Sequence, residues 1–465
     1  MNFGQTIREY ETEILDYLAE LIAIPSVSHP DQPLLGKPFG EESARALESI
    51  LSKGAELGFS VKNVGNYAGH VSYDCGEGDY AAVLSHVDVV PVGSGWETDP
   101  FTLTEKDGLL YGRGVLDDKG SAVISLFCLK ALKDHGVLGN RSIRCIFGAG
   151  EEVGMCDLEH YFAEEPLPSL SFTPDGEYGI CNREKGILHF TLETEQDFGV
   201  IHSFTGGYVA NAVPDTAQAV VDCTQEQCER LQQAAESSGE DYTLTYDVQL
   251  GRATVTVNGR AAHGSKPEDG HNAIMVLLML LSRVFVPEQL GKLPSFLAAY
   301  IKMETDGTSL SIAQSDAYSG SVTLNVGVLS IEEGAAKATI DIRYPVTASG
   351  EAIIEIICQQ AKEHGVFYQT MENLAPLYAE AESPLVTVLS EAYESVTGEK
   401  ATLYATGGGS YARCIPGHCV AFGPLFPGEP NRRLHESGEH MDKELFFRHA
   451  EICLEAMYRM IQLDL

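Results

Sequence analysis

In the stretch Ala81-Ala82-Val83-Leu84-Ser85-His86-Val87-Asp88 (residues 81–88), the apolar run Ala81–Ser85 predicts a short buried strand that delivers polar side chains at its end. Side chains alternate with a period of two along a strand, so His86 and Asp88 point to the same side. A lone His-x-Asp pair is more often structural than catalytic. Its place at the end of an apolar strand favours a functional interpretation, in which His86 binds a metal ion and Asp88 orients a ligand or the attacking base.

Three further apolar runs are each followed by acidic residues. The runs are Leu109–Val115, Ile143–Phe147 and Leu170–Thr173, and the acids are Asp117-Asp118, Glu151-Glu152 and Asp175. A predicted helix over Ser121–His135 separates the first two runs. Strands that alternate with helices, with polar side chains after each strand, predict an open α/β sheet in the first part of the chain.

These acids, together with His86 and the distant His435, offer the ligand types that two divalent cations sharing a bridging acid require. Asp117 could bridge the two ions, and Asp175 and His435 could complete one ligand set each. Within Glu151-Glu152, one acid could bind metal while its neighbour takes a proton from the attacking water. The alternatives are structural: Asp117-Asp118 could cap the following helix, and Glu151-Glu152 could be a solvated helix start.

The length of 465 residues predicts two domains. The α/β pattern of residues 1–186 gives way to alternating strands with two helices, and a helix from Pro384 returns to the first pattern. We therefore expect residues 187–382 to form an inserted α+β lid domain. Residues 1–186 and 383–465 would together form an open α/β catalytic domain.

The composition excludes several classes of partner. A net charge of −36 would repel phosphate backbones and anionic membrane surfaces, so neither nucleic acid nor a membrane is expected as a partner. The N-terminal segment lacks the basic flank and unbroken apolar core of a signal peptide. Eleven cysteines without paired spacing do not form a disulfide framework, and a reducing cytoplasm is the expected compartment.

Three polar features lie outside the strand ends. His263 is either a surface histidine of the inserted domain or, if the domains close, a donor to the developing oxyanion. Arg343 could clamp a carboxylate through its planar fork or form a simple ion pair. Gly407-Gly408-Gly409-Ser410 resembles an anion-binding turn before a helix, but it lacks the lysine of a nucleotide-binding P-loop.

Five stretches in order along the chain resemble the M20 family of metallopeptidases, and among its members the PepV-like bacterial dipeptidases, which are related to carnosinases. The stretches are Ser85–Pro91, Tyr111–Gly120, Gly150–Gly154, Pro174–Gly176 and Leu434–Glu436. They span nearly the whole chain, which makes the resemblance far more specific than any one motif.

The resemblance implies a role for each residue of the set. It implies His86 and Asp175 on one metal ion, Glu152 and His435 on the other, Asp117 bridging both, Glu151 as general base and Asp88 orienting His86. The family pattern Asp-x-Lys-Gly selects Asp117 over Asp118, and the pattern His-x-x-x-Glu, met by His435 and Glu439, selects His435 over His440. The resemblance also implies a cis peptide bond between Asp117 and Asp118.

The inserted domain contains a weak internal repeat. The stretches Gly207–Ala217 and Gly327–Ala338 both lead into a strand that ends near an aspartate, Asp222 or Asp341. Our hypothesis is a doubled lid, in which one chain supplies Asn211, His263 and Arg343 to its own site. The protein would then act as a monomer.

The expected activity is hydrolysis of short peptides, namely dipeptides with a free C-terminal carboxylate, by a water molecule that two divalent cations activate. Zinc is the expected metal, with manganese and cobalt as alternatives. Arg343 and Gly409 would hold the substrate carboxylate, and Asn211 would add a hydrogen bond near the reacting centre. The rivals are an N-acyl amino acid deacylase or carboxypeptidase with the same metal centre, and a non-catalytic binding protein that keeps the fold.

Overall fold

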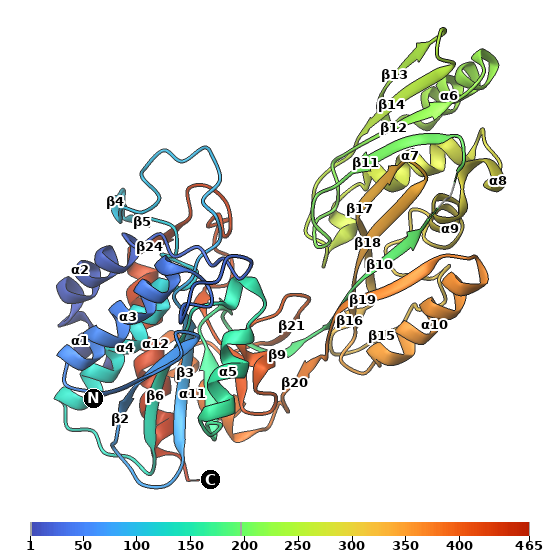
Figure 1. The fold of residues 1–465 in the computed structure, drawn as a ribbon. Helices are drawn as coiled ribbons and strands as arrows, with labels where there is room; N and C mark the ends of the chain where they lie inside the picture. The colour runs from blue at the N-terminus through green and yellow to red at the C-terminus, as the bar shows by residue number, and fades with distance from the viewer. Residues whose placement is uncertain (1, 196–197, 465) are drawn as a thin grey trace. The chain divides into compact units, whose positions relative to one another are not determined.

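The computed structural model describes residues 2–195 and 198–464. The chain forms two compact units, each with its own hydrophobic core (Figure 1). The first unit contains residues 1–183, 377–404 and 409–465, and the second contains residues 184–376 and 405–408. The second unit is thus an insertion into the first. This agrees with the expected fold, an α/β domain with an inserted α+β domain.

The first unit is built on a mixed sheet in the order β1-β2-β6-β3-β7-β22-β9-β20, with β21 also paired to β9. Its central strands β3, β6, β7 and β22 are parallel, so their carboxyl ends meet at one edge. The strand bounds are β1 Ser60–Val64, β2 Ala68–Tyr73, β3 Tyr80–His86, β6 Ser142–Gly148, β7 Leu170–Thr173, β9 Ile180–Glu184, β20 Leu377–Tyr378, β21 Leu403–Thr406 and β22 Cys419–Ala421.

Side chains of β3 alternate between two hydrophobic clusters, one on each face of the sheet. Ala81 and Val83 belong to one cluster, and Tyr80, Ala82 and Leu84 to the other. Helices cover both faces because each face is apolar. The helices are α1 Phe3–Arg8, α2 Glu11–Ile22, α3 Glu41–Glu56, α4 Lys119–Asp134, α5 Cys156–Glu164, α11 Pro384–Thr397 and α12 Lys443–Gln462. A small antiparallel sheet pairs β24 (His440–Asp442) with β5 (Leu109–Tyr111) and β4 (Thr104–Lys106).

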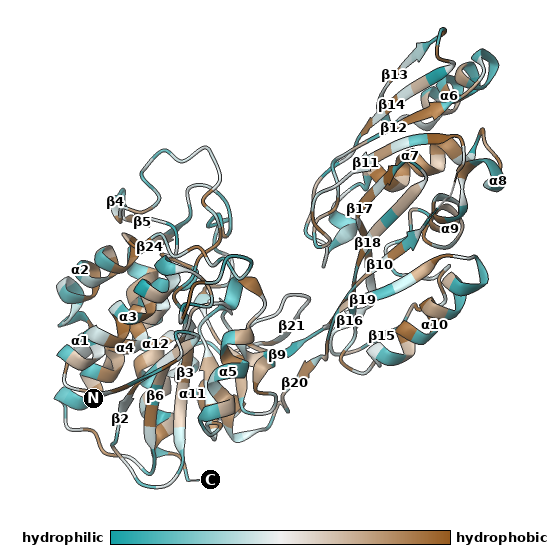
Figure 2. Cartoon of the chain, in the orientation of Figure 1, coloured by the Kyte–Doolittle hydropathy of each residue, from teal (hydrophilic) through white to brown (hydrophobic). Residues whose placement is uncertain are grey.

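The second unit is built on a large antiparallel sheet in the order β13-β14-β12-β11-β17-β18-β10-β19. The strands are β10 Gly186–Thr194, β11 Ile201–Gly206, β12 Thr216–Asp222, β13 Asp241–Asp247, β14 Arg252–Asn258, β17 Thr323–Glu332, β18 Ala335–Tyr344 and β19 Phe367–Leu374. Helices α6 (Gln225–Ser238), α7 (Ala273–Ser282), α9 (Lys292–Tyr300) and α10 (Gly350–Glu363) accompany it. Figure 2 shows that α7, with the sequence AIMVLLMLLS, is hydrophobic along its length, and it is buried in this core.

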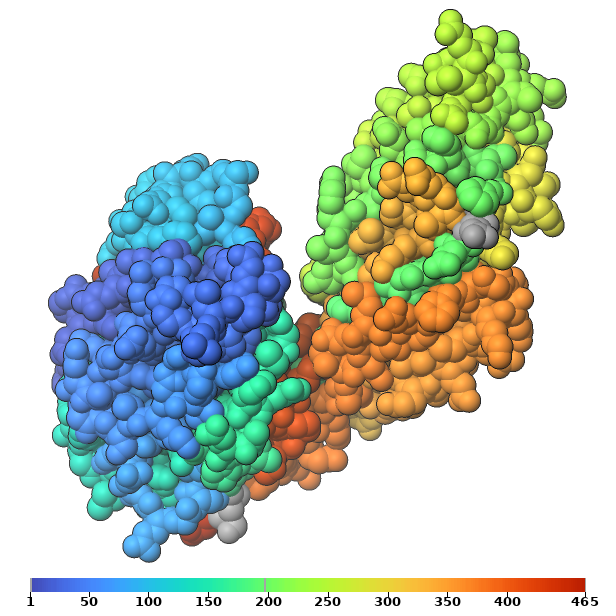
Figure 3. All heavy atoms as spheres, viewed as in Figure 1, coloured from blue at the N-terminus to red at the C-terminus, as the bar shows by residue number. Residues whose placement is uncertain are grey.

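The sheet order of the second unit reads as two matching halves. A hairpin, a helix and an edge strand occur as β11-β12-α6-β13 and again as β17-β18-α10-β19. The strand between hairpin and edge is β14 in one half and β10 in the other, and the halves join through the antiparallel pair β11 and β17. Figure 3 shows segments far apart in sequence, green and orange, packed together within this unit. This arrangement agrees with the internal repeat in the sequence.

Candidate metal centre

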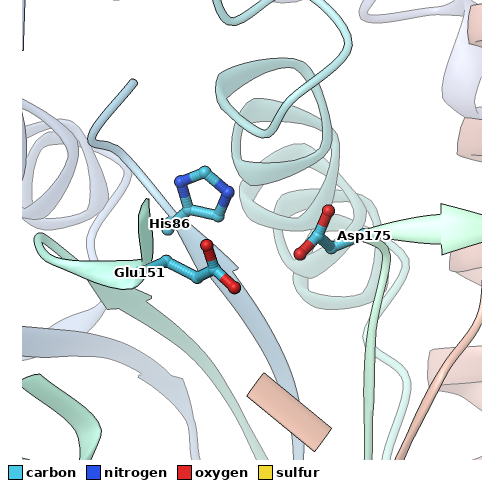
Figure 4. Close-up of side chains that lie close together, drawn as sticks. All are labelled: His86, Glu151 and Asp175. Atoms are coloured by element: carbon cyan, nitrogen blue, oxygen red, sulfur yellow. The ribbon is translucent and has the colours of Figure 1, made fainter. Parts of the chain in front are cut away.

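The strand ends of the first unit gather the candidate ligands. His86 is the last residue of β3 and pairs with Gly148, the last of β6, while β7 ends two residues before Asp175. The potential ligand atoms form two groups, and the atoms of each group all lie within 4.8 Å of one another. One group comes from His86, Glu151 and Asp175, and the other from His86, Asp117 and Glu152. Figure 4 shows the Glu151 and Asp175 carboxylates on either side of the space beside the His86 ring.

Asp117 lies between two imidazoles. Its Oδ1 is 2.9 Å from Nε2 of His86, and its Oδ2 is 2.8 Å from Nε2 of His435. The same His435 nitrogen is 3.3 Å from Oε1 of Glu152. A carboxylate whose two oxygens face two different histidines has the arrangement that a ligand shared by two ions needs. The peptide bond between Asp117 and Asp118 is cis, as the resemblance implied.

The alternatives for these positions have different surroundings. Asp118 makes no side-chain cap to α4, and its Oδ2 accepts from the backbone N–H of His86 at 3.3 Å. His440 lies on β24, where its ring packs against Tyr111 and its Nδ1 contacts the carbonyl of Gly438. Asp117 and His435 therefore contact each other in the structure, whereas Asp118 holds the backbone of His86 through its hydrogen bond.

The acidic turn Glu151-Glu152 is fixed by two buried carboxylates. The N–H groups of Glu151 and Glu152 donate to Oδ1 and Oδ2 of Asp88, both at 3.2 Å. The preceding N–H, of Gly150, donates to Oδ2 of Asp157 at 2.9 Å. Nδ1 of His86 contacts the backbone carbonyl of Asp88 at 3.0 Å and lies 3.4 Å from its carboxylate, so Asp88 orients both a ligand and the acidic turn. Glu151 is buried, which sets it apart from a solvated helix start.

The loop that carries Asp117 is held by Glu439. This fully buried carboxylate accepts from the N–H groups of Gly114, Leu116 and Asp117 at 2.9–3.2 Å. It also accepts from the guanidinium of Arg113 at 2.7 Å. The pattern His-x-x-x-Glu thus has a physical basis, because His435 faces Asp117 while Glu439 fixes the backbone of Asp117.

The site concentrates negative charge in a buried place. Burial, and then the neighbouring charges led by Asp117, raise the pKa of Asp175 to about 7. Burial and the charge of Asp175 raise the pKa of Glu151 well above its ordinary value, and burial with Asp117 raises that of Glu152. Burial opposes the charged form of His435, but its hydrogen bond to Asp117 and the nearby Glu152 carboxylate raise its pKa to about 11. Carboxylates this close repel one another when they are ionised, and bound cations would relieve that repulsion.

The donor set fits divalent cations. Oε1 of Glu152 is buried and accepts no hydrogen bond within the described part of the chain, although it faces the ring of His435. Imidazole nitrogens mixed with carboxylate oxygens suit zinc, manganese and cobalt. His86, Asp117 and Asp175 would hold one ion and Asp117, Glu152 and His435 the other. Glu151 belongs to the first group of ligand atoms as well, so the expected base lies within reach of that ion.

The predicted residues of the second unit form one cluster. The carbonyl of Asn211 accepts from N–H of Gly264 at 2.7 Å, which places the His263 turn beside Asn211. Arg343 is engaged by the fully buried Asp341 through Nε at 2.7 Å and Nη2 at 2.9 Å. Its Nη1 donates to the carbonyl of Gly407 at 3.0 Å. Arg343 therefore forms a buried ion pair and not the simple surface ion pair that was the alternative to a carboxylate clamp.

Gly409 has a different setting from the one its sequence suggested. The glycine run is followed by a single turn of 3₁₀ helix, Tyr411–Cys414, rather than by an α-helix. The hydroxyl of Ser410 accepts from N–H of Ala412, one of the first amides of that turn. The turn therefore lacks the aligned dipoles of an α-helix N-terminus.

Several residues that support the site were missed in the sequence. Asp157 accepts from the hydroxyl of Tyr411, whose ring lies edge-on to His86 with centroids 6.2 Å apart. Nothing in the spacing of Asp157 or Tyr411 marks them. The pairing of Asp341 with Arg343 could have been found, because the two residues stand two apart on one strand and side chains at that spacing share a face.

The geometry gathers side chains that could hold metal ions, and comparison with known proteins gives the family. The sequence model of Peptidase family M20/M25/M40 matches residues 82–462. The chain is 35% identical to "Putative dipeptidase YtjP" of Bacillus subtilis (strain 168), and the match covers 98% of both chains. It is 32% identical to a dipeptidase homologue of Staphylococcus haemolyticus (strain JCSC1435), again over 98% of both chains.

Solved structures share the fold at lower identity. Human carnosine dipeptidase 1 aligns with a TM-score of 0.62 and 16% identity, over 99% of this chain and 98% of that one. The di-peptidase Dug1p of Saccharomyces cerevisiae aligns with a TM-score of 0.60 and 15% identity, over 98% of both chains. The chain belongs to Peptidase family M20/M25/M40, and it is a peptide hydrolase. No helix within residues 2–195 or 198–464 has the length and apolar character needed to cross a membrane.

Proposed function

We propose that this peptide hydrolase cleaves dipeptides with a free C-terminal carboxylate, using two divalent cations held at the ends of β3, β6 and β7. The observation that carries the proposal is the Asp117 carboxylate, with one oxygen facing His86 and the other facing His435. The names of the curated relatives, which include dipeptidase, support the substrate class. A dinuclear metal-binding member of the family from Bacillus subtilis, with a TM-score of 0.52 to this chain, supports the metal content.

The cations, when bound, would polarise the scissile carbonyl and make the attacking water more acidic. Glu151 would take the proton of that water and pass it to the leaving amine. A general base works best when its pKa lies near the working pH, and burial shifts the pKa of Glu151 upward in that direction. Asp88 keeps the Glu151 backbone in place through its hydrogen bond, so the carboxylate needs little reorganisation.

The second unit would supply Asn211, His263 and Arg343 for substrate recognition, and the first unit would supply Gly409. His263 would donate to the developing oxyanion, Asn211 would add a hydrogen bond, and Arg343 with Gly409 would hold the C-terminal carboxylate. The two matching halves of the second unit support the hypothesis of a doubled lid, in which a monomer supplies Asn211, His263 and Arg343 in cis. The test is to dilute the protein while activity and light scattering are measured together. If turnover is lost as a dimer dissociates, the proposal of an active monomer is contradicted.

The substrate class is tested by parallel assays on dipeptides, longer peptides and N-acetyl amino acids with zinc, manganese or cobalt added. We expect dipeptides to be cleaved best, because Arg343 would read a carboxylate one residue beyond the scissile bond. Preference for N-acetyl amino acids would favour a deacylase, and preference for longer chains a carboxypeptidase. Inactivity with every metal and substrate would favour a binding protein. The cysteine pattern supports a reducing cytoplasm as the compartment.

The role of Glu151 is tested by Glu151→Gln, with the exposed Glu159→Gln of the same unit as control. We expect Glu151→Gln to lower kcat by roughly 10²–10⁴-fold, the range for loss of a general base. Bound metal, measured by elemental analysis, should be largely retained. Full activity of Glu151→Gln would remove it as the base, and a matching loss in Glu159→Gln would show a nonspecific effect.

A further inference from the structure

The ring of His263 is held by its neighbour Ser265 in a way that decides where its proton sits. The backbone N–H of Ser265 donates to Nδ1 of His263 at 3.1 Å, and Oγ of Ser265 lies 2.7 Å from the same nitrogen. A backbone N–H can only donate, so Nδ1 must be the acceptor in this pair. The hydroxyl, next to the same lone pair, then also donates. In a neutral imidazole whose Nδ1 accepts, the proton sits on Nε2.

The turn that carries this pair is fixed from both sides. N–H of Lys266 donates to the carbonyl of His263 at 2.9 Å and closes the turn, and N–H of Val213 donates to the carbonyl of Ala262 at 2.9 Å. A Cβ added at Gly264 would lie 2.7 Å from Oδ2 of Asp341 and 2.9 Å from the Asn211 backbone. The glycine therefore lets the turn sit against the buried ion pair of Asp341 and Arg343, where a larger residue would push it away.

The Ser265 side chain is confined as well. A Cβ added at Gly407 would lie 2.7 Å from Cβ of Ser265, and Gly407 is itself held through its carbonyl by Arg343. The serine thus stands between its own histidine and the Gly407 backbone. This close packing limits the rotamers of Ser265 and favours the one whose Oγ meets Nδ1.

We infer that Ser265 is a positioning residue that holds His263 as the neutral tautomer with its proton on Nε2. The functional consequence rests on the proposed role of His263 in oxyanion stabilisation. A preset Nε2–H is a donor that needs no proton rearrangement when the oxyanion forms, and preorganised donors of this kind give the largest electrostatic contributions to catalysis. The opposite tautomer would present a lone pair at Nε2 and repel the oxyanion.

The tautomer is tested on the full chain by selective ¹⁵N-histidine labelling and long-range ¹H–¹⁵N correlation spectra near neutral pH. The signal of His263 is assigned by its loss in His263→Asn. We expect Nε2 to carry the proton and Nδ1 to show the shift of an unprotonated acceptor. A proton found on Nδ1 would overturn the inference, whether or not the enzyme cleaves dipeptides, so its failure is distinct from failure of the proposed function.

The part played by the hydroxyl is tested with Ser265→Ala, Ser265→Thr and, as a control in the same unit, the exposed Ser237→Ala. We expect Ser265→Ala to increase the Nδ1–H tautomer and to lower kcat by roughly 10-fold with little change in KM, less than the ~10²–10³-fold cost of removing an oxyanion donor. Ser265→Thr, which retains the hydroxyl, should restore both readouts, and Ser237→Ala should change neither. Unchanged tautomer populations in Ser265→Ala would show that the hydroxyl does not set the tautomer.

Discussion

Replacing Glu439 by glutamine should loosen the loop that carries Asp117. The substitution changes none of the proposed metal ligands. The substitution keeps the size of the side chain but removes its charge. The Glu439 carboxylate accepts from three backbone N–H groups and from Arg113, and both Glu439 and Arg113 are almost completely buried. An amide would place an NH₂ group where at least one of these donors now points. Arg113 would be left as a buried cation without its partner.

The structure suggests the size of the effect. Removing one partner of a buried ion pair typically costs about 3–5 kcal/mol, because the remaining charge stays buried and uncompensated. We therefore expect Glu439→Gln to lower the free energy of unfolding of the first unit by about 3 kcal/mol or more. Arg113→Met should have a comparable cost for the same reason. The double variant should lose less than the sum of the two, because the partners share one interaction.

The chain provides its own probe for this measurement. Trp96 is its only tryptophan, and the Arg113 guanidinium lies over its ring at 5.4 Å. Denaturant unfolding of metal-free protein, followed by Trp96 fluorescence, would report on the first unit without interference from the second. The exposed Glu436→Gln is the control. A loss below about 1 kcal/mol in Glu439→Gln, or strict additivity in the double variant, would refute the argument from the buried pair.

Three further predictions concern pH, metal and the second unit. Burial lowers the pKa of His449 to about 3 from its ordinary 6.5, so the ring stays neutral in the folded protein but takes up a proton in the unfolded chain below pH 6.5. The contribution of His449 to the free energy of unfolding is therefore complete above pH 6.5 and declines as the pH falls below that value. In denaturant titrations the stability difference between wild type and His449→Gln should shrink by about 2 kcal/mol from pH 7 to pH 5, and substitution of the exposed His29 by glutamine is the control. Chelation should abolish peptide hydrolysis and lower the Trp96 unfolding midpoint, and re-added cations should restore both; activity that survives complete removal of metal would contradict the two-cation mechanism. Asp341→Asn should lower kcat/KM for dipeptides by roughly 10–100-fold through loss of Arg343 orientation, and unchanged kinetics would show that the ion pair does not serve substrate binding.

The central strands could be predicted because their signals are local. Leu170–Thr173 is a strand in the structure with the predicted bounds, and β3 extends the predicted Ala81–Ser85 by one residue at each end. A parallel sheet brings the carboxyl ends of neighbouring strands together, so polar residues after β3, β6 and β7 had to converge. This reasoning leads to His86, Glu151-Glu152 and Asp175 without knowledge of any neighbour outside the strands.

Contacts that depend on three-dimensional packing could not be predicted in the same way. The sheet is completed by β9, β20, β21 and β22, short strands without a distinct periodic signal that lie on both sides of the inserted unit in sequence. The two carboxylates that fix Gly150, Glu151 and Glu152 come from different segments, and only Asp88 was found. Asp157 stands at the start of α5, where an acid is expected for ordinary helix reasons. Its hydrogen bond to Gly150 can be seen only once α5 is packed beside β2 and the turn that carries Glu151.

The stretch Asp117-Asp118-Lys119-Gly120 shows how four adjacent residues can each serve a different neighbour. Asp117 faces two histidines, and Asp118 accepts from the His86 backbone. The buried Lys119 donates through Nζ to the carbonyls of Leu21 and Ile24, at the end of α2, at 3.0 and 2.6 Å. Burial lowers the pKa of Lys119 to about 7, opposed by the charges of Glu439 and Asp88.

Gly120 completes the stretch for a steric reason, because a Cβ there would lie 2.1 Å from the carbonyl oxygen of Val115. The family pattern Asp-x-Lys-Gly therefore combines one proposed ligand with two residues that hold its backbone. A buried lysine that satisfies helix-end carbonyls ties the loop to α2, and the glycine lets the loop close on itself. Substitutions at Lys119 or Gly120 should thus disturb the geometry around Asp117 although neither side chain would touch a cation. The spacing of such a motif reflects the backbone path that a ligand needs as much as the ligand itself.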